Sequence, residues 1–87
     1  MRIPELVPEV DLIVEYNTTQ RDSKSGNRER HIRVIREGML SETGYYRSYY
    51  PDQTGVWVND FSDGGREKFF VHSRIVSVRS ADIEDLL

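Results

Sequence analysis

Short apolar segments alternate with polar stretches along the chain, at a spacing of roughly ten residues that is typical of all-β domains. Residues 12–16 read LIVEY, and residues 30–36 alternate branched apolar with basic side chains. Alternation with a period of two indicates a β-strand with one buried and one exposed face. Further short β-prone segments lie at 45–50, 56–58, 68–72 and 74–78. The pattern predicts five or six short strands and no long helix, which favours a small barrel or sandwich.

The alternation also predicts which side chains are buried. In the first predicted strand, Leu12, Val14 and Tyr16 share one face because successive side chains of a strand point in opposite directions. In the second, Ile32 and Val34 share a face, and the residues between them are mostly basic. We expect the apolar set of each strand to face the core.

Polar and glycine-containing segments separate these strands. Residues 17–29 are almost wholly polar and predict a long hairpin loop, whereas residues 62–65, SDGG, predict a tight turn. Residues 1–10 carry prolines at positions 4 and 8 and are predicted as an extended lead-in. Residues 80–87 are predicted as a short C-terminal helix capped by Ser80.

A chain of 87 residues predicts a single domain over residues 1–87. It has no cysteine, which excludes disulfides, thiolate zinc sites and thiol nucleophiles. Its apolar runs are too short for a transmembrane helix or a signal-peptide core, so no membrane association is expected. A cytoplasmic location is the default expectation.

Charge is unevenly distributed along the chain, although the net charge is only −3. Residues 21–36 contain six basic residues against two acidic ones, and residues 64–79 contain four against one. The stretches around them are acidic. If the two basic segments lie side by side in the fold, we expect one compact basic face on an acidic protein.

Residues that could support catalysis are few. His31 and His72 each lie inside a predicted strand without metal-ligand spacing, and a structural role is favoured for both. Asp60 and Asp63 precede Gly64, but the EF-hand spacing is missing, so a hairpin turn is favoured over a calcium loop. No phosphate-binding loop occurs. The sequence therefore predicts no enzyme, no catalytic residue, no metal and no cofactor.

Two groups of side chains have a binding interpretation beside a structural one. Five aromatic residues either pack the core and cover the barrel wall or form a stacking platform for bases or another flat ligand: Tyr45, Tyr46, Tyr49, Tyr50 and Trp57. Four basic residues of the predicted strands are either solvated or form an anion site, because guanidinium and ammonium groups suit phosphates and carboxylates: Arg30, Arg33, Lys68 and Arg74.

The order of several motifs resembles that of WYL domains. Residues 68–78, KFFVHSRIVSV, are similar to the closing-strand motif of that family, basic–x–Phe–x–x–x–Arg–Ile followed by a short β tail. The earlier segments follow in the family's order: IVEY at 13–16, RHI at 30–32 and GYYRSYY at 44–50. The resemblance covers about residues 11–79. Gly44 and Tyr46 stand where the name-giving triplet has Trp and Leu.

The resemblance implies a small SH3-like or Sm-like β-barrel of five to six strands with a ligand-sensing or nucleic-acid-sensing role. Such domains occur in bacterial transcription regulators and phage-defence systems. Carried over by position, it nominates as ligand contacts Tyr16, Arg30, Tyr45, Lys68 and Arg74, to which the basic set adds Arg33. Because no helix-turn-helix precedes the barrel in this sequence, a free-standing module is expected.

The leading hypothesis is therefore a non-enzymatic module that binds an anionic ligand, either a nucleotide or a nucleic acid, through a basic and aromatic face. The alternative is a protein-interaction module, or a phage-encoded inhibitor that acts on a bacterial regulator or defence complex. It depends on acidic residues between Asp52 and Asp63 and in the tail 82–87, which could mimic an anionic partner. A homodimer is a further prediction, through an exposed edge strand at residues 56–58.

Overall fold

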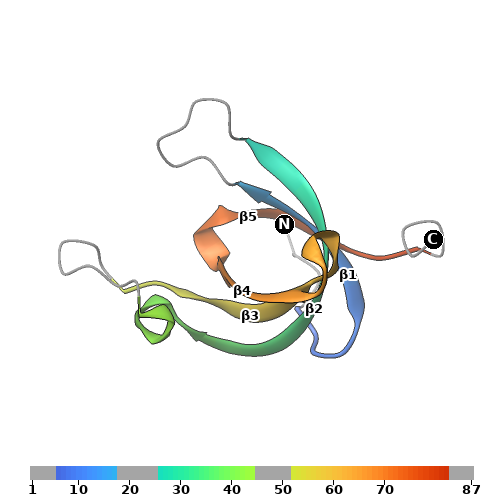
Figure 1. The fold of residues 1–87 in the computed structure, drawn as a ribbon. Helices are drawn as coiled ribbons and strands as arrows, with labels where there is room; N and C mark the ends of the chain where they lie inside the picture. The colour runs from blue at the N-terminus through green and yellow to red at the C-terminus, as the bar shows by residue number, and fades with distance from the viewer. Residues whose placement is uncertain (1–5, 18–25, 45–51, 83–87) are drawn as a thin grey trace.

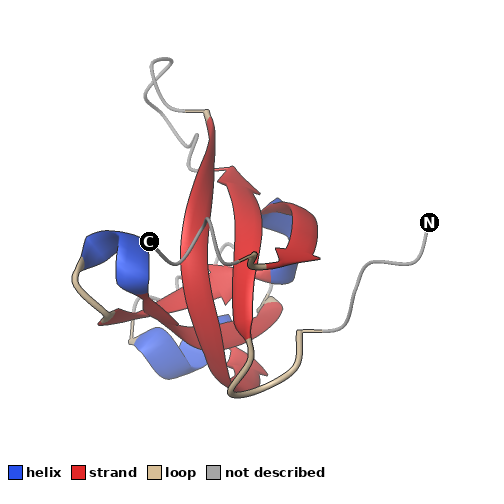
Figure 2. Ribbon diagram, turned by 90° about the vertical axis from the view of Figure 1, so that its right-hand side faces the viewer, coloured by secondary structure: helices blue, strands red, loops and turns tan. Residues whose placement is uncertain are grey.

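The computed structural model describes residues 6–17, 26–44 and 52–82. These residues form one five-stranded antiparallel sheet with the strand order β4-β3-β2-β1-β5 (Figures 1 and 2). The strands are β1 (Asp11–Asn17), β2 (Asn27–Met39), β3 (Thr54–Asp60), β4 (Arg66–Val71) and β5 (Ile75–Ser80). Three short 3₁₀ turns lie between them: η1 (Leu40–Thr43), η2 (Phe61–Asp63) and η3 (His72–Arg74). The predicted all-β class is confirmed.

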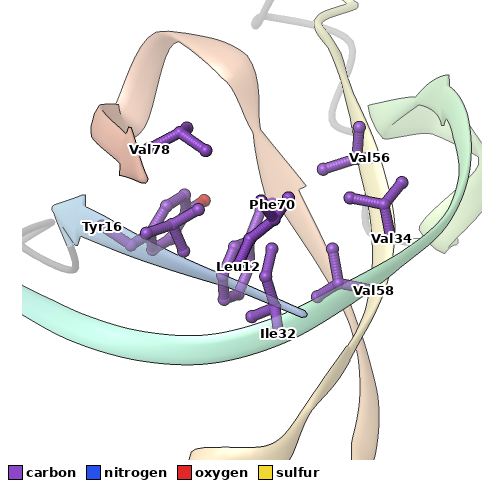
Figure 3. Packing of buried hydrophobic residues seen from close by; sticks show 9 residues of the cluster. Leu12, Tyr16, Ile32, Val34, Val56, Val58, Phe70 and Val78 are labelled. Carbon is purple, nitrogen blue, oxygen red and sulfur yellow. The ribbon is translucent and has the colours of Figure 1, made fainter. Parts of the chain in front are cut away.

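The sheet bends round on itself (Figure 1). The buried side chains of the core lie on its concave side (Figure 3). β1 pairs with β2 on one side and with β5 on the other, so the last strand lies beside the first. η3 connects β4 to β5. No ladder joins these two strands within the described part of the chain, so complete closure into a barrel stays a prediction.

Inward-facing residues from all five strands form the core (Figure 3). The predicted burial of Leu12, Val14 and Tyr16 in β1 is confirmed, as is that of Ile32 and Val34 in β2. The remaining members of the core cluster come from β3, β4 and β5: Val56, Val58, Phe70 and Val78. Branched residues dominate this set, as expected where strand side chains fill a small curved sheet.

Tyr16 connects β1 to the far end of the sheet from inside. Its ring stacks on Phe70 of β4 with 4.2 Å between the ring centroids and 14° between the planes. Its hydroxyl accepts a hydrogen bond of 3.0 Å from the backbone N–H of Val71. Because β1 and β4 are not neighbours in the sheet, these contacts hold the curved sheet together across the core.

The boundaries of β2 differ from the prediction. The strand was expected over residues 30–36, but it extends from Asn27 to Met39. Its register with β3 shifts between Val34 and Arg36, which leaves Ile35 as the extra residue of a β-bulge. The bulge lets β2 bend with the sheet and stay paired with β3 as far as Met39. The strand therefore continues beyond the point where the alternation of apolar and polar residues ends.

Two other expectations require correction. Residues 56–58 do not form an edge strand, because β3 pairs with β2 on one side and β4 on the other. The predicted edge at Trp57 is therefore wrong, and the homodimer stays a prediction. Ser80 is the last residue of β5 and caps no helix. The rest of the predicted helix, residues 83–87, lies outside the described residues, as does the predicted strand at 45–50.

Candidate functional site: an arginine–aromatic face

The structure does not bring the nominated residues together in one place. Arg30 and Lys68 lie on the concave face, because their cross-strand partners in the register, Val14 and Val58, face the core. Arg33 lies on the other, outer face of the sheet, because it stands directly between the buried Ile32 and Val34 and successive side chains of a strand alternate between faces. Tyr16 is in the core, and Arg74 is in η3. Tyr45 lies outside the described residues.

Arg30 and Lys68 both bind one buried carboxylate, that of Asp60. Arg30 donates to Asp60 Oδ2 from Nε at 3.0 Å and from Nη2 at 2.8 Å, and Lys68 Nζ donates to the same oxygen at 2.8 Å. The other oxygen of Asp60 accepts the backbone N–H of Ser62 at 2.9 Å. Lys68 also pairs with Asp63 at 2.9 Å. The charges of both cations are thus matched within the protein.

Asp60 is 0% exposed, and its ionisation depends on these partners. Burial alone would raise the pKa of Asp60, but the hydrogen bonds from Arg30 and Lys68 outweigh it and hold the pKa below its ordinary value. The carboxylate therefore stays charged at neutral pH and anchors the β3–β4 turn. From the sequence, Asp60 is predicted only as part of the turn. The signal for its burial was its alternation with Val56 and Val58.

Tyr16 and Arg74 form a second, separate group. Burial raises the pKa of the Tyr16 hydroxyl, while the Val71 N–H and the nearby Arg74 guanidinium act in the opposite direction. Arg74 is half-buried beside this hydroxyl. Since Tyr16 is buried and its oxygen already accepts a hydrogen bond, the pair stabilises the junction of β1 with the β4–β5 connection.

The outer face of β2 and β3 carries a different constellation, which we name the arginine–aromatic face and define by Arg33, Arg36, Trp57 and Phe61. The guanidinium carbon of Arg33 lies 5.3 Å from the centre of the Phe61 ring. That of Arg36 lies 5.7 Å from the centre of the Trp57 ring. Both distances fall within the range of cation–π contacts.

The β-bulge is what places both arginines on this face. Positions 33 and 36 differ in parity, so a regular strand would direct their side chains to opposite faces. With Ile35 as the extra residue, Arg33 lies opposite Asn59 and Arg36 lies opposite Trp57, two positions away on the same face of β3. The backbone positions of the two arginines are therefore about 7 Å apart along the strand direction of β3.

Neighbouring rings support this face from the sides. Phe69 of β4 meets Trp57 edge-on at 5.2 Å, and His31 of β2 meets Phe61 at 5.1 Å. Phe61 is an exposed residue. The side chains of Arg33 and Arg36 are 51% and 54% exposed. Both guanidinium groups are thus held against rings and still reach solvent.

Each arginine of the face is also paired with a carboxylate. Arg33 donates to both oxygens of Asp11, at 2.9 and 3.1 Å, and His31 Nε2 lies 2.7 Å from Asp11 Oδ1. Arg36 Nη1 donates to Glu42 Oε1 at 3.2 Å. The hydrogen bonds from Arg33 and His31 lower the pKa of Asp11. Both pairs are charge-neutral when their carboxylates are ionised.

The acidic segment proposed as an anion mimic is occupied by internal contacts at its described carboxylates. Asp52 accepts hydrogen bonds of 3.0 Å from the backbone N–H and the hydroxyl of Ser41. Asp60 and Asp63 bind the cations of the concave face. These carboxylates stabilise turns of the fold, which weakens the alternative of an acidic mimic.

Among the residues that the structure describes, no group of three or more histidine, cysteine, aspartate or glutamate side chains could hold a metal ion. In the same part of the chain, no helix is long and apolar enough to cross a membrane. No protein-family model matches this chain, and neither a curated protein nor a solved structure matches it significantly.

The sequence predicts only part of the arginine–aromatic face. Arg33 is among the predicted ligand contacts, and Trp57 belongs to the predicted aromatic cluster. Arg36 belongs to the basic segment without a predicted contact, and no sequence pattern indicates a role for Phe61. The adjacent apolar residues Val34 and Ile35 interrupt the alternation, but this interruption alone does not distinguish a bulge from the end of the strand, so the sequence does not place Arg36 beside Arg33.

Proposed function

We propose that this chain is a non-enzymatic binding module that holds a nucleic-acid strand, or a nucleotide, on the arginine–aromatic face. The observation that carries the proposal is the occurrence of two arginine–ring pairs on one face, Arg33 on Phe61 and Arg36 on Trp57. Isolated solvated arginines would not need a shared face or a ring beneath each of them.

The chemistry of these pairs suits a nucleic acid. A guanidinium that rests on a ring keeps its other face for a base and its edge N–H groups for phosphate oxygens. Aromatic rings add stacking surfaces that accept any base. Because the two arginines lie on the same strand about 7 Å apart, a ligand that meets both carries more than one phosphate. This favours a strand over a nucleoside monophosphate.

The resemblance to WYL domains supports the same proposal in general terms, since it implies ligand sensing by a basic and aromatic face. We propose a WYL-like barrel whose contact face is displaced from the nominated positions. Of those, Arg33 belongs to the face, whereas Arg30 and Lys68 are engaged by Asp60. The alternative of a protein-interaction module or inhibitor stays a prediction that no described contact favours.

Replacing both arginines, Arg33→Gln with Arg36→Gln, is expected to weaken oligonucleotide binding about tenfold or more, because two phosphate contacts are lost. The dependence of log affinity on log salt should become shallower by about two. The measurement is fluorescence anisotropy of a labelled single strand of about twelve nucleotides, titrated at several salt concentrations. Trp57, the only tryptophan of the chain, provides a label-free readout, since a strand bound over its ring should quench it.

The matched control is Arg28→Gln with Arg66→Gln, which removes the same charge from two exposed arginines outside the face. Its affinity should fall much less than that of the face variant, and its Trp57 quenching should persist. An equal loss of affinity in both double variants would show that binding is non-specific charge attraction, and this would contradict the proposed site. Absence of binding to the native chain at low salt would contradict the function itself.

A further inference from the structure

We propose that Asp11 and Glu42 occupy the anion positions of the arginine–aromatic face, and that a ligand binds by exchanging its phosphates with these two carboxylates. The inference rests on the proposed function and concerns the regulation of the same site. In the native chain without ligand, the two arginines of the face are paired with these two carboxylates. Removing either carboxylate should therefore strengthen binding.

The contact of Asp11 with Arg33 has the geometry that a phosphate would take. Arg33 uses Nε and Nη2, two N–H groups on one edge of the guanidinium, to bind the two oxygens of Asp11 at 2.9 and 3.1 Å. A phosphate presents two oxygens to the same edge. Asp11 comes from β1, the strand next to β2, and is also shared with His31 at 2.7 Å. The carboxylate is thus built into the sheet beside the arginine.

Glu42 is fixed against Arg36 by the turn that follows β2. Its Oε2 accepts the backbone N–H of Met39 at 2.6 Å while Oε1 accepts Arg36 Nη1 at 3.2 Å. The N–H of Met39, together with Arg36, lowers the pKa of Glu42. A side chain at Gly38 would overlap the carboxylate of Glu42. Glycine at this position therefore leaves the space in which the carboxylate reaches Arg36.

The cost of exchange is small for each pair, because ion pairs at exposed side chains are weak in water. Arg33 and Arg36 are each about half exposed, so the paired carboxylates are displaceable. They come from different elements, β1 and η1. Their effects on affinity should consequently multiply.

The test measures affinity for the same labelled single strand at fixed salt, with Asp11→Asn and Glu42→Gln. Each substitution should raise affinity about twofold to fivefold, and the double variant about tenfold. The control is Glu67→Gln, which removes an equal charge from the same outer face, since Glu67 lies opposite Asn59 in the register of β3 and β4. Glu67 should change affinity by less than about twofold.

The outcomes separate this inference from the proposed function. If the native chain binds and the arginine variants lose binding, but Asp11→Asn and Glu42→Gln match Glu67→Gln, carboxylate exchange is overturned and the site stands. If the native chain does not bind the strand at low salt, the proposed function fails, and the inference fails with it. Thermal melting of each variant identifies any change in affinity that comes from unfolding.

Discussion

Asp60→Asn is expected to lower the free energy of unfolding by about 3 kcal/mol, because it leaves two cations beside a neutral amide in place of their shared carboxylate. Asp60 is fully buried, and Arg30 and Lys68 both donate to its Oδ2. The value lies at the lower end for a broken buried pair, since the side chains of Arg30 and Lys68 remain 21% and 30% exposed and regain some water. Urea denaturation at neutral pH measures the difference.

The matched control within the same cluster is Asp63→Asn. Asp63 also binds Lys68, at 2.9 Å, but it is exposed. Its replacement should lower the free energy of unfolding much less than Asp60→Asn does, because ion pairs at the surface contribute little. A similar loss of stability for Asp60→Asn and Asp63→Asn would mean that the burial of Asp60 does not determine its contribution to the free energy of unfolding.

The pH dependence of stability should also differ between the native chain and Asp60→Asn. The pKa of Asp60 is lower in the folded chain than its ordinary value of 3.8, so its contribution is fully present above that value. The contribution is lost as the pH falls through the lower, folded pKa. The acid side of the stability curve should therefore be flatter for Asp60→Asn than for the native chain, and denaturation series between neutral and acidic pH would show this.

Tyr16→Ala is expected to cost about 4 kcal/mol, because it removes a buried ring from the core and opens a cavity beside Phe70. Tyr16→Phe keeps the ring and removes only the oxygen that accepts the Val71 N–H. That change should cost about 1–2 kcal/mol, the usual penalty of an unpaired buried donor.

The comparison of the two Tyr16 variants by thermal or urea unfolding distinguishes ring packing from the hydrogen bond. Equal stability of Tyr16→Phe and the native chain would show that the hydroxyl does not help to hold β1 against the end of β4. A loss for Tyr16→Ala no larger than that for Tyr16→Phe would contradict the assignment of the ring to the core.

The sequence predicted the strands because their alternation reports burial directly. Leu12, Val14 and Tyr16 are buried together, as the period of two requires. The alternation also contained the burial of Asp60, which continues the series of Val56 and Val58, although a charged residue before a turn is more often exposed. Its partner Arg30 is distant in sequence, and the pairing of β2, β3 and β4 is what brings both Arg30 and Lys68 to it.

The candidate site was less predictable for two physical reasons. Arginines of a strand look alike in sequence whether they bind a ligand or an internal carboxylate, and pairing across strands decides between these. Arg30 and Arg33 lie three positions apart in β2, so the period of two places them on opposite faces, but only the structure shows that Arg30 binds the buried Asp60 and that Arg33 binds Asp11 on the outer face. The arginine–aromatic face further depends on the bulge at Ile35, which is a property of the pairing between β2 and β3.

The bulge at Ile35 changes which positions of β2 face the core. Up to Val34, even-numbered positions face the core, whereas beyond Ile35 the odd-numbered Glu37 lies opposite the buried Val56. A substitution at position 36 is therefore governed by the rules of an outer position, although the numbering that begins with Ile32 assigns it to the interior. Gain or loss of one residue at this point would exchange the two environments for every position from 36 to the end of the strand.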